Sequence, residues 1–297
     1  MASIWSDLLG AKVNYYGRRY RTRVIEAGEG APVIFIHGIG GHAEAYSRNL
    51  IRLGRKFRAM AIDLVWHGLS SKPPFNPATL DTYCDQLLDL MDTLGIERAS
   101  IEGESLGGWI TQWMALNHAD RLDRIVLNTT AGIIFGSGTV QERPREGIEL
   151  LRDRSLAAIA NPTSETIRKR LEWLMAAPDR VTDELVDIRQ RLYSEPDTQR
   201  ALHAVFDNAF SKGGAFSRYG IKEERLAEIK TPTLVLWSDK NPGNGPDSGK
   251  RIASLISGAQ FYCINDAAHW PQWEQPEEHD RVVTAFLNGE RIGEPAD

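Results

Sequence analysis

A serine stands between two glycines in Gly103-Glu104-Ser105-Leu106-Gly107, where an expected strand meets an expected helix. Residues 99–102 are typical of a short buried strand, and apolar residues recur at helical spacing from position 106. So tight a turn strains the backbone of its central residue, and the flanking glycines let strand and helix approach without a side-chain clash. The sequence predicts a strand, a sharp turn and a helix, with Ser105 as a candidate nucleophile or, more simply, a helix cap.

The alternation of strands and helices extends over most of the chain. It is typical of a mostly parallel sheet covered by crossover helices. We therefore predict an α/β fold with seven or eight strands. Strands are expected at 20–27, 32–36, 58–64, 99–102, 124–128, 233–237 and 260–264, and helices at 46–53, 80–94, 106–117 and 275–288.

The middle of the chain has a different pattern. From about residue 138 to 210 no segment is typical of a buried strand, and helices are expected at 145–156, 164–175, 182–194 and 198–210. Glycine-rich stretches at 136–138 and 211–214 flank this region, and such stretches are common where a chain leaves and re-enters a core. We predict an inserted helical cap over 138–212 and a core made of 1–137 and 213–297.

The loop His37-Gly38-Ile39-Gly40-Gly41 follows the second expected strand. Its Ile39 N–H, together with that of Leu106, can form an oxyanion hole, in which each donor is typically worth ~3 to 4 kcal/mol. His37 is expected to support this loop by hydrogen bonding, although a glycine-rich turn is also ordinary loop chemistry.

His269 follows the last expected strand and is the candidate base, because it is a group that titrates near neutrality on a loop at the same sheet edge as Ser105. The loop after the strand at 233–237 should supply a carboxylate that orients this histidine. Asp239 is the nearest carboxylate, but by register the acid position is Asn241. An amide there could orient the imidazole but would stabilise its cation less than a carboxylate does. We therefore choose Asp239 as the third member of the triad, with Asn241 as the alternative.

Composition excludes several classes of partner. The formal net charge is −5 and the basic residues are scattered, which argues against nucleic acid and against an anionic membrane and favours a neutral or mildly anionic small molecule. No apolar run approaches the roughly 20 residues that a membrane span needs, and the N-terminus lacks the apolar region of a signal peptide, so we expect a cytoplasmic protein. No group of His, Cys and carboxylates has zinc-like spacing, so no metal or other cofactor is expected.

The Ser105 turn, the His37-Gly38 loop and the late His269 together resemble the α/β-hydrolase superfamily over nearly the whole chain. The stretch from His269-Trp270-Pro271-Gln272-Trp273-Glu274 to Val283, and more weakly the segment from Pro144 to Arg191, resemble one branch, the meta-cleavage product hydrolases of aromatic degradation. In that family a cap arginine, matched here by Arg189, binds the carboxylate of a 2-hydroxy-6-oxo-dienoate.

The resemblance implies that Trp270 forms an aromatic wall of the substrate pocket. Gly38, Gly40 and Glu104 are further candidates for substrate binding. It implies ketonisation of the dienol followed by cleavage of the carbon–carbon bond, with no cofactor. Two departures stand out: Glu104 precedes the serine where these hydrolases often carry asparagine, and Asn241 occupies the acid position.

Two other functions fit the same residues. A carboxylesterase uses the same serine, base and oxyanion loop, and a non-catalytic relative with a weakened triad would bind ligand without turnover. Relatives of this type often self-associate, and the oligomeric state stays open.

Overall fold

The computed structural model describes residues 3–140 and 146–293. In these residues an eight-stranded sheet forms the centre of the molecule, and only its first two pairings, β1 with β2 and β2 with β4, are antiparallel. The strands, in spatial order, are β1 (Lys12–Tyr16), β2 (Thr22–Ala27), β4 (Arg58–Ile62), β3 (Pro32–Ile36), β5 (Ala99–Glu104), β6 (Leu122–Asn128), β9 (Thr233–Ser238) and β10 (Gln260–Ile264).

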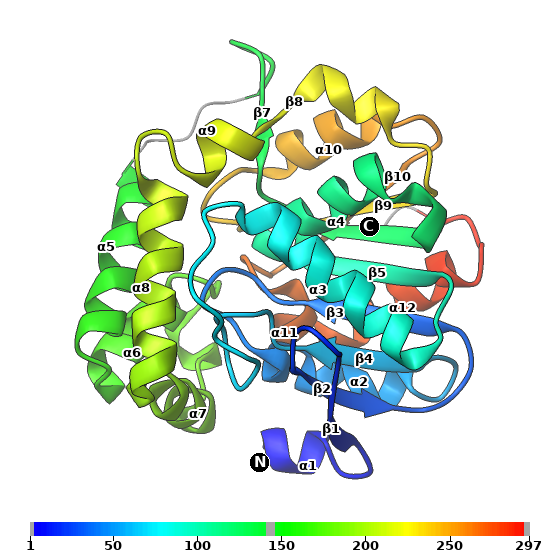
Figure 1. Ribbon diagram of the computed structural model, residues 1–297. Helices are drawn as coiled ribbons and strands as arrows, with labels where there is room; N and C mark the ends of the chain where they lie inside the picture. The colour runs from blue at the N-terminus through cyan, green and yellow to red at the C-terminus, as the bar shows by residue number, and fades with distance from the viewer. Residues whose placement is uncertain (1–2, 141–145, 294–297) are drawn as a thin grey trace.

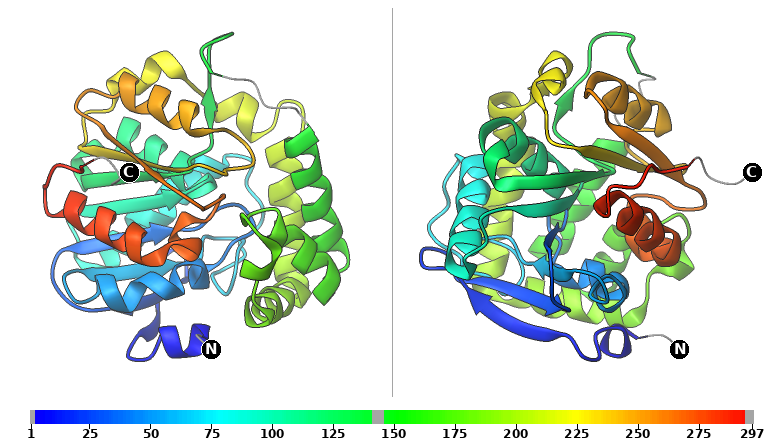
Figure 2. Two further views of the ribbon diagram at one scale, coloured as in Figure 1. Left: turned by 180° about the vertical axis from the view of Figure 1, so that it is seen from behind. Right: turned by 90° about the vertical axis from the view of Figure 1, so that its right-hand side faces the viewer.

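Helices cover both faces of this sheet (Figures 1 and 2). One face carries α3 (Thr79–Leu94), α4 (Leu106–Asn117) and α10 (Pro246–Leu255), and the other carries α2 (Ser47–Leu53) and α12 (Pro276–Leu287). The central strands are apolar on both sides because alternate side chains pack against each helical layer. Two short helices, α1 (Ile4–Asp7) and α11 (Pro271–Glu274), lie beside α2.

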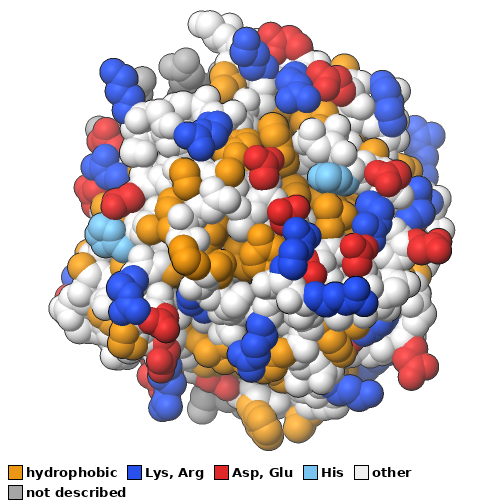
Figure 3. Space-filling view, viewed as in Figure 1, with side chains coloured by type: hydrophobic (Ala, Val, Ile, Leu, Met, Phe, Trp, Pro, Cys, Tyr) orange, Lys and Arg blue, Asp and Glu red, His pale blue; other side chains and the backbone are white. Residues whose placement is uncertain are grey.

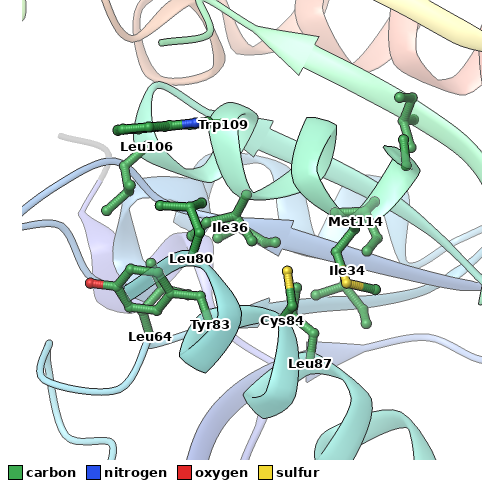
Figure 4. Packing of buried hydrophobic residues seen from close by; sticks show 14 of the residues in the cluster. Ile34, Ile36, Leu64, Leu80, Tyr83, Cys84, Leu87, Leu106, Trp109 and Met114 are labelled. Carbon is green, nitrogen blue, oxygen red and sulfur yellow. The ribbon is translucent and has the colours of Figure 1, made fainter. Parts of the chain in front are cut away.

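Figure 4 shows the packing between the sheet and the first of these layers. Cys84 of α3 is buried there between Leu87 and the strand residue Ile34, with Met114 of α4 close by. Its thiol is free, as is that of the half-buried Cys263. Cys84 is therefore a small apolar core residue.

Four more helices, α5 (Glu146–Ala160), α6 (Ser164–Glu172), α7 (Asp183–Ser194) and α8 (Pro196–Phe210), pack side by side at one end of the sheet (Figure 1). They lie in sequence between β7 (Ile133–Ile134) and β8 (Ile221–Lys222), which pair with each other, and are followed by α9 (Ala215–Tyr219). The four helices expected in this region are thus present. Arg145, the first residue of the expected helix, and Pro144, where the segment of the family resemblance begins, lie outside the described residues.

The α/β-hydrolase arrangement predicted from the sequence is confirmed. The sequence missed β1, because its exposed, mixed side chains show no apolar alternation. It also ended the fifth strand early, since β5 continues through Gly103 to Glu104, the residue before the serine.

Acidic and basic side chains are interspersed over the face of the molecule drawn in Figure 3. In the described chain, no helix combines the length and apolar character that a bilayer crossing requires. Those same residues contain no group of three or more His, Cys, Asp or Glu side chains arranged to hold a metal ion.

Candidate active site

Ser105 lies in the sharp turn that the sequence predicted. Its backbone has φ 53° and ψ −110°, a left-handed conformation that side chains other than glycine rarely adopt. A Cβ on Gly103 would overlap the carbonyl oxygen of Gly107, and one on Gly107 would overlap that of Ile36. The two glycines are therefore required by the close approach of β5, α4 and β3.

The turn is held by its own backbone. The N–H of Ser105 donates to the carbonyl of Asn128 over 3.1 Å, and its carbonyl accepts from Trp109 and Ala131. These bonds fix the serine at the carboxyl end of the sheet and at the N-terminus of α4. Strain is thus stored where the serine hydroxyl is presented, as in other nucleophile turns of this kind.

The glycine-rich loop after β3 lies next to this turn. The Nδ1–H of His37 donates to the carbonyl of Gly38, and its Nε2 accepts from the N–H of Leu64, so His37 supports the loop as expected. Gly40 has φ 70°, and its carbonyl accepts from the Tyr193 hydroxyl on α7 over 2.8 Å. The loop is therefore tied both to the sheet and to the helices above it.

The two N–H groups predicted for an oxyanion hole have no hydrogen-bond acceptor within the described residues. These are the N–H groups of Ile39 and Leu106, and Ile39 and Leu106 both line the space beside Ser105. Donors that are already oriented and unpaired are what a developing oxyanion requires.

His269 is held on three sides. Its N–H donates to the carbonyl of Leu174 and its carbonyl accepts from Thr129 Oγ1, while its ring packs edge-on against Trp173 at 5.8 Å. Burial lowers the pKa of His269 to about 3, and the nearby charge of Arg170 contributes to this shift. The imidazole is therefore neutral at physiological pH, as a general base must be.

The residue hydrogen-bonded to the imidazole is Asn241, and our choice of Asp239 is corrected by this geometry. His269 Nδ1 lies 2.7 Å from Asn241 Oδ1. Asp239 sits one position beyond β9 and accepts from the N–H of Ala267 over 3.2 Å, which holds the turn that precedes the histidine. One residue, Lys240, separates Asp239 from Asn241, whose side chain faces the ring.

Glu104 lies on the other side of the ring. Its Oε1 is 3.2 Å from His269 Nε2, and its Oε2 accepts from the N–H of Gly38 over 2.7 Å. Burial raises the pKa of Glu104 to about 8. Among the hydrogen bonds of the described residues none joins Ser105 Oγ to His269, and the ring nitrogen that would face the serine lies against Glu104 instead.

Two buried arginines surround this group. Arg189 lies behind Trp270, with its Cζ 5.3 Å from the ring centre, and is not among the residues that line the cavities at Ser105. Arg170 of α6 does line one of them, and its Nε donates to Ser155 Oγ over 2.7 Å. Within the described chain, Arg170 Nη1 and Arg189 Nε and Nη2 have no hydrogen-bond partner.

Arg170 was not among the residues expected from the sequence to line the site. A signal for it exists, because Arg170 shares the buried side of α6 with Ile167 and Leu171. An arginine on the apolar face of an amphipathic helix is rarely there without a partner or a ligand.

Two cavities meet at Ser105 and His269, and Ile39, Leu151 and Trp173 also line both. The larger, of about 230 Å³, extends between α3, α4 and α8, and we call it the apolar cavity. The smaller, of about 20 Å³, lies toward α6, and we call it the polar cavity. The apolar cavity is lined further by Tyr83, Trp109, Val205, Ala209, Phe210 and Phe216, and the polar cavity by Gly38, Gly41, Glu104, Arg170, Leu174 and Trp270.

Comparison with known proteins agrees with this fold. The family model of the alpha/beta hydrolase fold matches residues 31–276. A 2-hydroxy-6-oxo-6-phenylhexa-2,4-dienoate hydrolase of Comamonas testosteroni is 29% identical over 88% of this chain and 89% of its own length. A 2-hydroxy-6-oxononadienedioate/2-hydroxy-6-oxononatrienedioate hydrolase of Pseudomonas putida is 30% identical over 88% and 90%.

Among solved structures, the meta-cleavage product hydrolase CumD from Pseudomonas fluorescens IP01, in a mutant form complexed with acetates, superposes with a TM-score of 0.78 at 28% identity. The superposition covers 95% of this chain and 99% of that one. The chain therefore belongs to the α/β-hydrolase family, and within it resembles the meta-cleavage product hydrolases.

Proposed function

We propose that this protein hydrolyses a carbon–carbon bond in a 2-hydroxy-6-oxo-2,4-dienoate, the class of compound named for the relatives in Comamonas and Pseudomonas. The observation that carries the proposal is Arg170, a buried cation with an unpaired Nη1 in the described chain, which lines the same cavity as Ser105. A guanidinium taken out of water needs an anion, and a substrate carboxylate would supply one.

The charge of the polar cavity favours an anionic substrate. Burial lowers the pKa of Arg170 to about 10, with a contribution from Arg189, so the guanidinium stays protonated at neutral pH. Arg189, the family's carboxylate-binding position, contributes a second positive charge from behind Trp270. Glu104 is largely protonated below pH 8 and offsets little of this charge.

The apolar cavity would then receive the group beyond the scissile ketone. A substrate with its carboxylate on Arg170 and its ketone at Ser105 extends from the polar cavity into the apolar one. Apolar lining with a few polar groups at one end is the usual design of such a site, and it fixes which end of the substrate enters first.

The chemistry follows from the leaving group. Cleaving a carbon–carbon bond expels a carbanion, and ketonisation of the dienol lets that carbanion form as an enolate conjugated with the 2-oxo carboxylate. Water or Ser105 adds to the distal ketone, the N–H groups of Ile39 and Leu106 hold the oxyanion, and His269 moves the protons. The products are a 2-hydroxy-dienoate and a carboxylic acid.

Residues 138–212 would act as a cap. Leu151 of α5 and Trp173, which follows α6, line both cavities, and Val205 of α8 lines the apolar one, so this region would set substrate choice and keep bulk water from the bond being broken. The substrate is a small molecule that needs no cofactor from this site, and we place the reaction in the cytoplasm.

The test is turnover of a yellow ring-fission dienoate, followed by loss of its visible absorbance. We expect the wild type to bleach it and Ser105→Ala to lose at least about a thousandfold in rate, the usual cost of losing a nucleophile. Ser254→Ala, an exposed serine on α10, is the matched control and should keep wild-type activity.

A wild-type enzyme that leaves the dienoate unchanged but hydrolyses p-nitrophenyl esters would be a carboxylesterase. Tight binding of the dienoate with neither activity would identify a ligand-binding relative. Either result refutes carbon–carbon hydrolysis.

A further inference from the structure

The His269 ring is contacted at both nitrogens. Asn241 Nδ2 donates to the carbonyl of Asn244 over 2.7 Å, so the amide is oriented with its oxygen toward the ring. Because that oxygen can only accept, Nδ1 of His269 carries the hydrogen, and Nε2 of the neutral ring is an acceptor. The group 3.2 Å from this acceptor is the carboxyl of Glu104.

Glu104 Oε1 has no hydrogen-bond partner among the described residues, although it lies 3.2 Å from Nε2 of His269. The other oxygen of Glu104 already accepts the Gly38 N–H, and the side chain is only 1% exposed, so no bulk water solvates a charge at Oε1. The protonated carboxyl can donate to Nε2, whereas a carboxylate facing the lone pair of a neutral imidazole would repel it.

The charged groups around Glu104 leave the proton on the carboxyl. Burial raises the pKa of Glu104, Arg170 and Arg189 act in the opposite direction, and Glu102 adds to the increase. Burial also lowers the pKa of His269. The pair therefore holds one proton, on the oxygen side, with a vacant nitrogen base beside it.

We propose that Glu104 is a catalytic acid that acts together with His269 as base in ketonisation of the bound dienol. This inference rests on the proposed function and names the residue that performs its first step. Both side chains line the polar cavity together with Ser105, so an acid and a base open onto the same space. Tautomerisation needs both, since one proton is given to carbon while another is taken from oxygen.

The step balances without any co-reactant. The O–H bond of Glu104 breaks as a C–H bond forms at carbon 5, the two carbon–carbon double bonds become one between carbons 3 and 4, and the 2-hydroxyl becomes a carbonyl. As Glu104 gives up its proton to carbon, Nε2 of His269 takes the proton of the 2-hydroxyl, whose O–H bond breaks. A carboxylate and an imidazolium remain 3.2 Å apart, and return of one proton restores the starting pair.

This arrangement also gives the two departures from the family a common role. With an amide at 241, no carboxylate faces Nδ1, so the imidazolium formed during the step relies on the carboxylate of Glu104 at Nε2. After the proton has returned to Glu104, His269 is neutral again and can assist addition of the nucleophile to the ketone. In this chain the carboxyl group that stabilises the imidazolium belongs to Glu104 and lies at Nε2 of His269 instead of Nδ1.

The test compares wild type with Glu104→Gln in single-turnover rapid mixing with the dienoate and, in parallel, with p-nitrophenyl acetate, which needs no ketonisation. Glutamine keeps the size of the side chain and an acceptor for Gly38 N–H but has no proton that it can transfer. We expect decay of the bound dienol absorbance to slow at least about a hundredfold, the usual minimum for loss of a general acid, and at least tenfold more than ester hydrolysis. Glu97→Gln, an exposed acid before β5, is the matched control and should behave as wild type.

The double variant Glu104→Gln/Asn241→Asp separates an acid from a stabilising charge. A carboxylate at 241 should raise ester hydrolysis by stabilising the imidazolium, yet leave dienol decay slow because the proton donor is still missing. Recovery of dienol decay to within tenfold of wild type would show that Glu104 only stabilises the cation and would overturn the proposal.

A parallel loss of both activities in Glu104→Gln would likewise overturn it, since a residue that merely positions His269 affects both reactions. Residual ester hydrolysis reports that the variant is folded. Failure of the proposed function would be seen first in the wild type, which would leave the dienoate intact. Failure of the role proposed for Glu104 would be seen only in the variants.

Discussion

The two cavities that meet at Ser105 use opposite physical principles. The apolar cavity is built from aromatic and aliphatic side chains of α3, α4 and α8, and it binds by removing apolar surface from water. The polar cavity contains buried ionisable groups, Glu104 and Arg170, whose hydrogen-bonding capacity is incompletely used within the described residues. The first selects by size and the second by charge, so together they define a substrate with one charged and one apolar end.

His269 stands at the boundary between them. Its Nδ1 faces Asn241, which lines the apolar cavity, and its Nε2 faces Glu104, which lines the polar one. On the proposal made for Glu104, proton transfer belongs to the polar cavity, and the apolar cavity positions the scissile bond. The four predictions that follow test this division, beginning with the largest expected effect.

Arg170→Met should remove the charge selectivity of the polar cavity. Loss of a hydrogen bond to a charged group costs about 1.5 to 3 kcal/mol, so we expect KM for the dienoate to rise roughly 10- to 100-fold while hydrolysis of neutral esters falls much less. Steady-state kinetics with both substrates measure this. Arg168→Met, which removes a partly exposed arginine of the same helix paired with Asp183, should change KM less than twofold.

Arg189→Met is the informative comparison for that experiment. A larger rise in KM than for Arg170→Met would show that the substrate carboxylate binds to Arg189, the position that the sequence indicated. It would contradict direct binding by Arg170.

The pH dependence should differ between the two reactions. Burial raises the pKa of Glu104 to about 8, and the acid is active only while protonated. The value of kcat/KM for the dienoate should therefore fall about tenfold per pH unit above pH 8, with no matching decline for p-nitrophenyl acetate. Profiles between pH 6 and 10 check this, and a decline in the Glu104→Gln variant at the same pH would assign it to another group.

Ala209→Phe should fill the apolar cavity without touching the polar one. Added volume in a packed site costs about 1 to 3 kcal/mol, so kcat/KM for a dienoate with a phenyl group beyond the ketone should fall roughly tenfold, and that for a methyl ketone should change little. Ala204→Phe places the same group on α8 toward an outer groove. Equal losses for both variants, or for both substrates, would argue that the apolar cavity does not hold this group.

The smallest effect on activity is expected for a change at His279, which lies below the polar cavity. This histidine contacts Glu102, two residues before Glu104 on β5. Oε1 of Glu102 is 2.7 Å from Nε2 of the buried His279. Burial alone would lower the pKa of His279, but the charges of Glu102 and Asp280 outweigh it and raise the pKa to about 9. Because this pKa exceeds the value in the unfolded chain, protonation stabilises the fold below about pH 6.5, and that stabilisation is lost as pH rises through 9.

The melting temperature of wild type should accordingly fall by a few degrees between pH 7 and pH 10, and His279→Gln should be less stable at pH 7 and show a shallower pH dependence. Identical pH dependence in the two proteins would show that this pair contributes no titratable stability. The contrast with Glu104 is instructive, since Glu102 lies against the protonated ring of His279 whereas Glu104 lies against the neutral ring of His269.

Most strands and helices could be predicted from the sequence because each has a local pattern of apolar residues. Continuous apolar runs predicted β3, β5 and β9, and the glycines at 103 and 107 predicted the turn because a side chain at either position would overlap backbone. β1 has no such pattern, since its side chains are exposed or half-buried on a sheet edge, and so it was missed.

The sequence by itself determined the fold class, the serine, the histidine and the oxyanion loop, since each is set by its place at the end of a strand. Only the tertiary structure decided which groups face the histidine. One loop brings Asn241 to Nδ1 and leaves Asp239 on a backbone N–H, while Glu104 reaches Nε2 from β5. Such contacts join residues far apart in the chain over distances near 3 Å, and no periodicity in the sequence records them.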